Sequence, residues 1–259
     1  MLEMININSL PVFLLIFVRV IAFFVTLPLF SYRTIPVPFK VGFSFFLAWI
    51  MFYTVDSTAI PVDGMYLFLL LKEALVGLLI GLIAYIILSA VQIAGGFIDF
   101  QMGFAIANVV DPQTGAQTPL TGQYFYIFAL LFLLSVNGHH LLIDGIFNSY
   151  YFIPIDAFIP FHNGSISDFV IETFNYMFLV AFQMAIPIVG CLFLVDVALG
   201  MIARTVPQLN VFVVGLPLKI LVSFIVILFF LSLYIVLVKS LFETIFQALR
   251  GLMQLFGGA

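Results

Sequence analysis

Five charged residues lie in or beside long apolar stretches, where an isolated charge is costly and needs a partner. They are Arg19, Glu73, Asp99, Asp196 and Lys219. Acids placed in this way can relay protons in a transporter, which is one function that the pattern allows. We favour the alternative that these residues cap helices, reach the membrane interface or form ion pairs between subunits, because four of the five lie at segment boundaries.

A second polar group has residue types that bind metals. It consists of Asn137, Gly138, His139 and His140, followed by Asp144. Adjacent histidines on a helix point about 100° apart, and no third ligand stands at a suitable spacing. The group is therefore interpreted as a structural turn, and no metal site is predicted.

Signatures of common enzyme chemistry are missing. The chain contains no H-E-x-x-H, no G-x-S-x-G, no G-x-x-x-x-G-K-[ST] and no pair of cysteines. Its single cysteine, Cys191, lies in an apolar run and is expected to behave as a small buried hydrophobe. We therefore expect no enzyme activity and no cofactor.

Two polar stretches connect apolar segments. Residues 111–119, Asp-Pro-Gln-Thr-Gly-Ala-Gln-Thr-Pro, are the longest polar run, and their Pro and Gly predict a loop. Residues Arg204 to Asn210 are predicted to form a tight turn between two helices. An ordinary solvent-facing connection remains the alternative for the first stretch.

The composition implies that membrane helices position these residues. Of the 259 residues, 64% are hydrophobic and 8% are charged, against about 25% charged in soluble domains. Most of the exterior must therefore face lipid or other protein. The net charge of −4 gives no attraction to nucleic acid. The first ten residues carry no Lys or Arg, so a cleaved signal peptide is not expected.

Six apolar regions are separated by polar breaks. They are Leu10 to Leu29, Val41 to Val55, Glu73 to Asp99, Tyr124 to Val136, Thr173 to Val195 and Ile220 to Val238. The first is long enough to cross a bilayer, whereas the second and fourth are short. Residues Leu141 to Phe161 contain two prolines and are expected to be irregular, and the sixth region is expected to end at Lys239.

The predicted fold is an all-α, polytopic integral membrane protein of helical hairpins broken by Pro and Gly, with residues 1–259 as a single membrane domain. Gly77 and Gly81 would let a second helix approach closely. Residues 239–259 form an amphipathic tail, expected to lie on a membrane surface or against a partner helix. Its apolar face carries Phe242, Ile245, Phe246, Leu249, Met253 and Phe256, and its polar face Lys239, Glu243, Gln247, Arg250 and Gln254.

The chain resembles the FliR family of flagellar biosynthesis proteins and their relatives in virulence type III secretion. The resemblance covers nearly the whole chain and is strongest in a motif between residues 196 and 219. The matching positions are Asp196, Ala198, Gly200, Arg204, Pro207, Gln208, Asn210, Val211, Phe212, Gly215, Pro217 and Lys219, with Asn137 to His140, Gln101, Gly103, Asp111, Pro112, Arg33 and Pro36 in the expected order.

The resemblance implies a non-enzymatic channel subunit of the flagellar type III protein export gate, in the bacterial inner membrane at the flagellum basal body. It would assemble with FliP-like and FliQ-like subunits in one helical hetero-oligomeric export gate, and FlhA-like and FlhB-like components would act nearby. The other partners implied are exported unfolded flagellar proteins and the lipid bilayer. Alternatives are a virulence type III secretion subunit and a small-solute transporter.

The resemblance also assigns roles to the polar stretches. The loop from Val110 to Gly122 would be a plug in the lumen, and the turn from Arg204 to Asn210 would lie near the cytoplasmic entrance. The expected plug residues are Val110, Asp111, Pro112, Gln113, Thr114, Gly115, Ala116, Gln117, Thr118 and Pro119. The expected entrance and assembly residues are Asp196, Gly200, Arg204, Pro207, Gln208, Asn210, Gly215, Pro217 and Lys219.

Overall fold

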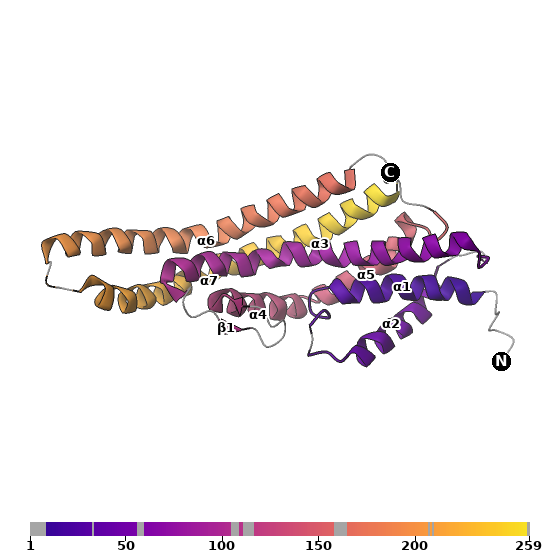
Figure 1. Ribbon diagram of the computed structural model, residues 1–259, viewed down its shortest axis with the longest axis horizontal. Helices are drawn as coiled ribbons and strands as arrows, with labels where there is room; N and C mark the ends of the chain where they lie inside the picture. Colours follow the sequence, from indigo (N-terminus) through magenta and orange to yellow (C-terminus); the bar gives the residue numbers. More distant parts are fainter. Residues whose placement is uncertain are drawn as a thin grey trace. The chain divides into compact units, whose positions relative to one another are not determined.

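The structure is a computed structural model that describes residues 9–32, 34–55, 60–104, 109–110, 117–157, 165–206, 208 and 210–257. The described part of the chain is helical apart from one short strand pair, which confirms the predicted all-α class (Figure 1). The helices are α1 (Leu10–Thr26), α2 (Val37–Phe52), α3 (Gly64–Met102), α4 (Leu120–Ser135), α5 (Gly138–Phe152), α6 (Ser165–Thr205) and α7 (Val211–Gly257). The strands are β1 (Val109–Val110) and β2 (Gln117–Thr118), which pair antiparallel.

Three helices within the described residues are long and apolar enough to cross a membrane: α3, α6 and α7. Helices α4 and α5, separated by a break, would make a fourth span if they cross together. Helices α1 and α2 are apolar but short. The predicted mixture of long, short and broken apolar segments is therefore confirmed, and a simple chain of six crossings is not what the structure contains.

The first apolar region is shorter as a helix than we predicted. Helix α1 has 17 residues and ends at Thr26, so it is about 25 Å long at 1.5 Å per residue. The next residue, Leu27, has an extended backbone with ψ of 128°. It precedes Pro28, whose ring disfavours helical geometry in the residue before it. The helix therefore ends three residues before Leu29, the predicted end of this apolar region.

Two other predicted boundaries are also wrong. The segment from Leu141 to Phe161 was expected to be irregular, but residues 141–152 belong to the regular helix α5, because Pro154 and Pro160 both lie beyond its end. Residues 153–157 are irregular, as expected. The last apolar region does not end at Lys239, since α7 continues as one helix of 47 residues to Gly257. Its amphipathic spacing persists across that lysine, and Pro217 lies inside the helix without ending it.

The described helices belong to two compact units. The first unit contains Met1–Ile87, Val136–Phe174 and Thr244–Ala259, and the second contains Leu88–Ser135 and Asn175–Glu243. The division at residue 87 falls inside the long helix α3, so one helix contributes residues to both units. The expectation of one membrane domain over residues 1–259 stays a prediction.

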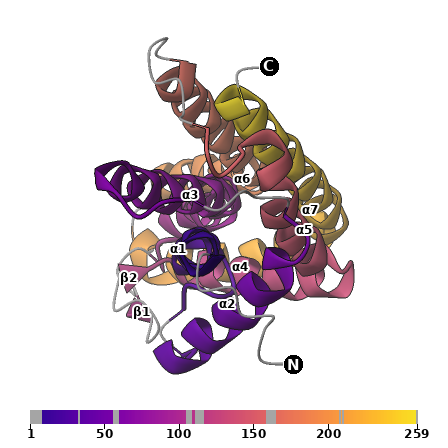
Figure 2. The same ribbon diagram turned by 90° about the vertical axis from the view of Figure 1, so that its right-hand side faces the viewer.

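In the first unit, α2 packs beside α1 (Figure 1 and Figure 2). The Phe13 ring contacts Phe45 and Trp49 edge to face, with ring centroids 5.2 Å and 5.8 Å apart. Helix α1 also approaches α3 closely at Gly77 and Gly81, as the small-residue spacing predicted. A Cβ atom added at Gly77 would collide with the backbone carbonyl of Arg19 in α1.

The C-terminal part of α7 also packs within the first unit. Leu249 and Met253 lie 3.9 Å from where a Cβ of Gly145 in α5 would be, and Phe169 of α6 lies beside Gly251. The amphipathic tail therefore lies against a helix, which was one of the two predicted alternatives. The helix belongs to the same chain.

The second unit contains an equally close helix contact. The backbone of Gly122, near the start of α4, lies against Gly95 of α3 with no room for a Cβ atom at either position. Phe97 of α3 stacks on Phe182 of α6, with ring centroids 4.7 Å apart. On α7, Tyr234 donates a hydrogen bond to the carbonyl oxygen of Phe125. These contacts hold α3, α4, α6 and α7 together within the second unit.

Candidate functional site

Arg19 and Glu73 form an ion pair in which both side chains have no exposed surface. The Arg19 Nη2 donates to Glu73 Oε1 at 2.9 Å, and Nε donates to the other carboxylate oxygen, so the contact is bidentate. Such a pair has the geometry in which guanidinium and carboxylate fit best. It joins α1 to α3 in the interior of the first unit.

Arg19 also binds α5 and the segment after it. Its Nη1 donates to Ser149 Oγ at 3.0 Å, and its Nη2 donates to the Ile153 carbonyl oxygen at 3.1 Å. The guanidinium carbon lies 3.7 Å from the centroid of the Tyr150 ring, within cation–π distance. A single buried arginine thus connects three helices of the unit.

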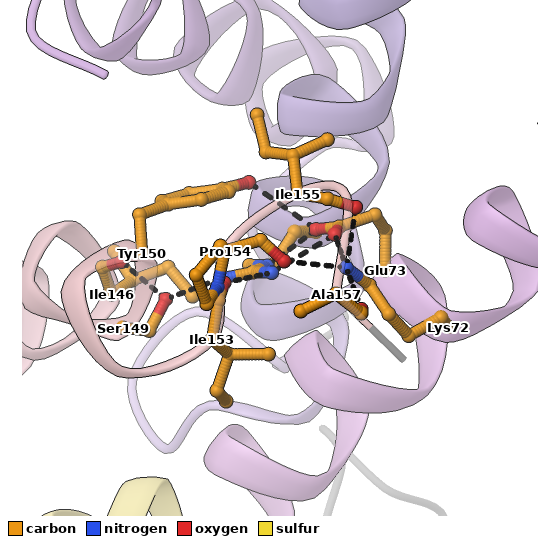
Figure 3. Close-up of polar contacts among 10 residues, drawn as sticks. Lys72, Glu73, Ile146, Ser149, Tyr150, Ile153, Pro154, Ile155 and Ala157 are labelled. Atoms are coloured by element: carbon orange, nitrogen blue, oxygen red, sulfur yellow. Dashed lines mark hydrogen bonds and ion pairs between the residues drawn. The ribbon is translucent and has the colours of Figure 1, made fainter. Parts of the chain in front are cut away.

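Lys72 is a further member of this cluster that we did not predict from the sequence. Its side chain is 4% exposed, and its Nζ lies 2.7 Å from Glu73 Oε1. The ammonium also donates to carbonyl oxygens in the segment that follows α5 (Figure 3). The signal that could have found it is the adjacent Lys-Glu pair in an apolar run, because one acid faces two cations once Arg19 is counted.

Asp99 caps the start of α4. Its carboxylate, 2% exposed, accepts a hydrogen bond from the Thr121 backbone N–H at 3.1 Å and another from the Thr121 hydroxyl. The first backbone N–H groups of a helix lack partners within it, and a carboxylate is favoured there. The predicted capping role is confirmed for this residue.

A second polar cluster joins three helices of the second unit. Asp196 of α6 pairs with Lys219 of α7 at 2.8 Å, and the Gln101 side-chain amide of α3 donates to the same carboxylate at 2.8 Å. The side chains of Asp196 and Lys219 are 39% and 18% exposed. Neighbouring helices of the same chain supply the partners of this pair and of Arg19 with Glu73, whereas the sequence had suggested ion pairs between subunits as one alternative.

The Asn137 to His140 group lies at the break between α4 and α5. Asn137 has a left-handed backbone with φ of 56°, and α5 begins at Gly138. The rings of His139 and His140 are 4.1 Å apart. Among the described residues, no group of three or more His, Cys, Asp or Glu side chains gathers as a metal site would require.

The expected entrance residues lie on both sides of the α6–α7 connection. Arg204 is exposed in the last turn of α6, where its positive charge interacts favourably with the helix dipole. Asn210 precedes α7, and its side-chain oxygen accepts a hydrogen bond from the Val213 N–H at 3.4 Å. Gly200 is exposed, Gly215 is buried in α7, and Gln208 is exposed, whereas Pro207 lies outside the described residues.

Only part of the expected plug can be placed. Val110 pairs with Gln117 in the β1–β2 ladder, which Thr118 and Val109 complete, and Pro119 lies directly before α4. Residues 111–116 lie outside the described residues. The structure therefore places the base of this connection between α3 and α4, and the plug assignment stays a prediction.

The described helices and their polar clusters define a class of protein: a helical membrane protein whose buried charges are used to join helices. The family model for bacterial export proteins, family 1, matches residues 10–245. The chain belongs to this family of bacterial export proteins.

Individual relatives agree with the family assignment. The chain is 56% identical to the flagellar biosynthetic protein FliR of Bacillus subtilis (strain 168) over 97% of its own length and 98% of the relative's. It is 28% identical to FliR of Escherichia coli (strain K12) over 89% and 88%. It is 33% identical to Yop proteins translocation protein T of Yersinia pestis over 82% of each chain. The resemblance to the FliR family is thereby confirmed.

Proposed function

We propose that this chain is a non-enzymatic channel subunit of the flagellar type III protein export gate. The observation that carries the proposal is the 56% identity to a flagellar biosynthetic protein over nearly the full length of both chains. The long apolar helices support a membrane location, for which we propose the bacterial inner membrane at the flagellum basal body. The charged residues support a structural role, since the buried Arg19–Glu73 pair, the buried Asp99 and the partly exposed Asp196–Lys219 pair each hold helices together.

We further propose that FliP-like and FliQ-like subunits share the gate with this chain, and that FlhA-like and FlhB-like components act beside it. Surface that the chain leaves uncovered supports this proposal. In the most apolar window of α7, only 6% of the residues are buried. Phe229 is 82% exposed and Leu228 is 71% exposed. Lipid or neighbouring subunits must cover side chains of this kind, because exposure of so much apolar surface to water is unfavourable.

Replacement of FliR in Bacillus subtilis tests the proposed function. A strain that lacks its own FliR should regain flagellar export and motility when it expresses this chain, because the two proteins are 56% identical. The control is the same strain with Yop proteins translocation protein T, which should not restore export. Failure of this chain to restore any secretion, while it accumulates in the membrane at the level of the native protein, would contradict the proposal.

The same strain distinguishes the proposed function from two other candidates. A virulence secretion subunit is the second candidate, supported by 33% identity to the Yersinia protein, but the flagellar relative is much more similar. A small-solute transporter remains from the sequence analysis, on the basis of its buried acids. Proton- or sodium-coupled uptake by the purified chain alone in liposomes would support that alternative, and restored motility would contradict it.

We propose that residues 110–122 form the plug of the closed gate. A channel wide enough for an unfolded chain must be blocked at rest, and this Pro- and Gly-containing connection carries one charge, Asp111. Replacing residues 113–117 with a shorter glycine linker should raise ion permeability while the complex still assembles. An intact complex with no added leak and normal secretion would exclude this role.

We propose that the turn from Arg204 to Asn210 packs and orients the gate's entrance. Arg204 is exposed, so its replacement by alanine should change the chain's own unfolding free energy by no more than about 0.5 kcal/mol. The same substitution should nevertheless reduce secretion or the yield of the assembled complex. Normal motility and normal complex yield would remove the basis for an entrance role.

A further inference from the structure

The ammonium group of Lys72 is surrounded by four oxygen atoms within the first unit (Figure 3). Its Nζ lies 2.9 Å from the carbonyl oxygen of Pro154, 2.7 Å from that of Ile155 and 3.1 Å from that of Ala157. The fourth oxygen is Glu73 Oε1, at 2.7 Å. Because the Lys72 side chain is 4% exposed, these protein oxygens take the place of a hydration shell.

Three of these oxygens belong to a stretch of backbone that is not helical. Helix α5 ends at Phe152, and residues 153–157 follow without regular structure. Irregular backbone in a membrane protein is tolerated where it is buried in protein and its polar groups have partners. Lys72 donates to three of the carbonyls, and Arg19 donates to that of Ile153. Cationic side chains thus supply the donors that a helix would otherwise provide.

The contacts combine directed hydrogen bonds with the coordination of a cation. An ammonium group has three N–H bonds, so four oxygens cannot each receive a separate linear hydrogen bond. The distances of 2.7 to 3.1 Å suit an N–H-bearing cation and exceed the oxygen distances of Ca²⁺, about 2.3–2.6 Å, and of Mg²⁺, about 2.0–2.1 Å. The oxygen cage therefore fits an ammonium-type ion better than a small divalent metal.

The charges around the cage also favour a single positive charge. Glu73 is the carboxylate in contact with Lys72, and it is already paired with the buried Arg19. A divalent ion would add a second positive charge next to Arg19 without adding an anion, which is costly at a buried position. A singly charged group leaves the cluster closer to neutrality.

We propose that Lys72 is a positioning residue that acts as a tethered cation: its ammonium fills a site for one singly charged, N–H-bearing cation and thereby fixes residues 153–157. Removal of the side chain leaves a site for a free alkylammonium ion, formed by Glu73 and the three carbonyl oxygens. The inference concerns the chain's own packing and does not depend on the proposed export function.

Chemical rescue of the Lys72→Ala variant tests this site. The full-length variant is purified in detergent, and its melting temperature is measured in ethylammonium chloride and in tetramethylammonium chloride at equal concentration. We expect Lys72→Ala to melt below the unchanged chain and ethylammonium to recover most of the loss in a saturable manner. Tetramethylammonium carries the same charge but no N–H bond, and it should recover none.

Matched variants separate the cage from general effects of salt and charge. Lys72→Met keeps an apolar side chain in place of the lysine stem, so ethylammonium should not rescue it. Lys239→Ala makes the same change at an exposed position of α7, and it should neither lower the melting temperature nor respond to ethylammonium. Lys72→Gln keeps N–H donors without the charge, and it should remain less stable than the unchanged chain.

Several outcomes would overturn the proposal. They are an unchanged melting temperature in Lys72→Ala or Lys72→Gln, and an equal response of Lys72→Ala to both salts. If Lys72→Ala does not accumulate in membranes, its accumulation becomes the measurement. Growth with ethylamine should then restore the protein level, and failure to restore it would count equally against a tethered cation.

Discussion

At the scale of single residues, the Arg19–Glu73 contact is a buried ion pair with a bidentate geometry and no exposed surface. Replacing Glu73 with Gln leaves two buried cations without their carboxylate, which should lower the unfolding free energy by about 3–5 kcal/mol. Replacing Arg19 with Met should have a cost of similar size. Equilibrium unfolding of the full-length chain in detergent, followed by circular dichroism, provides the measurement.

The double variant Arg19→Met/Glu73→Gln decides whether the two residues act as a pair. Because it removes both charges, it should be less destabilised than the sum of the single variants. Asp144→Asn is a suitable control, since Asp144 lies outside the ionic cluster and its change should be nearly neutral. Strict additivity of the Arg19 and Glu73 effects would show that the pair is not coupled.

The Asp196–Lys219 pair should behave differently, because both side chains are partly exposed. Ion pairs in contact with solvent contribute about 0–1 kcal/mol, so Lys219→Met should change the unfolding free energy of the isolated chain only slightly. If the pair serves assembly, as the resemblance to the FliR family implies, the same variant should reduce the recovery of the complex with its other subunits. A decrease of several kcal/mol in the unfolding free energy of the isolated chain would instead show that the pair mainly stabilises the fold.

At the scale of helices, the contact between α1 and α3 depends on two glycines. A Cβ at Gly77 would collide with the Arg19 carbonyl, and one at Gly81 would collide with the Thr26 hydroxyl. Gly77→Ala and Gly81→Ala should therefore push the helices apart and lower stability by about 1–3 kcal/mol. Thermal unfolding in detergent would measure the loss.

Gly42 provides the matched control for these substitutions. It lies within α2, and a Cβ there would meet no atom within 4 Å. Gly42→Ala should stabilise the helix by about 0.5–1 kcal/mol, because alanine loses less conformational freedom than glycine on folding. If all three substitutions had the same effect, close approach of α1 and α3 would not explain the role of Gly77 and Gly81.

The sequence predicted the type of these elements better than their ends. Apolar content correctly indicated a helical membrane protein, and the glycine spacing correctly indicated a close helix contact. The end of α1 depended on Pro28, and the continuation of α7 depended on helical spacing that persists past Lys239. Hydropathy alone does not include the backbone effect of Pro28 and treats Lys239 as a boundary, so it placed both ends wrongly.

The partners of the buried charges could not be predicted for a related reason. Arg19 and Glu73 are 54 positions apart in the chain, and Gln101 is 95 positions from Asp196. Only packing of the helices brings such residues together, whereas their cost in an apolar environment is evident from the sequence. For Lys72 the sequence shows only the adjacent Lys-Glu pair, because its other partners are backbone carbonyl oxygens, which leave no signature in residue type.

At the scale of the whole molecule, the exposed apolar side of α7 should matter more for assembly than for folding. Phe229 is 82% exposed, so Phe229→Lys should leave the melting temperature of the detergent-solubilised chain nearly unchanged. The charge should nevertheless lower the amount of chain in membranes or in the complex, because lipid and apolar partners exclude it. Quantitative immunoblotting of membrane and complex fractions would measure this.

The buried Ala185 of α6 provides the contrasting position. It is 2% exposed, so Ala185→Lys should lower the melting temperature of the isolated chain as well as its recovery. If Phe229→Lys and Ala185→Lys destabilised the isolated chain equally, α7 would be part of the folded core and would not be an available surface.

The lengths of α6 and α7 have a consequence for the life of the protein in the cell. With 41 and 47 residues, they would extend about 60 Å and 70 Å as straight helices, roughly twice the hydrocarbon thickness of about 30 Å. The bilayer alone cannot cover the whole apolar surface of these helices. A newly synthesised copy without its partner subunits would therefore be a substrate for proteases that remove unassembled membrane proteins. Its abundance should therefore follow the supply of the subunits synthesised with it, and surplus copies should be degraded.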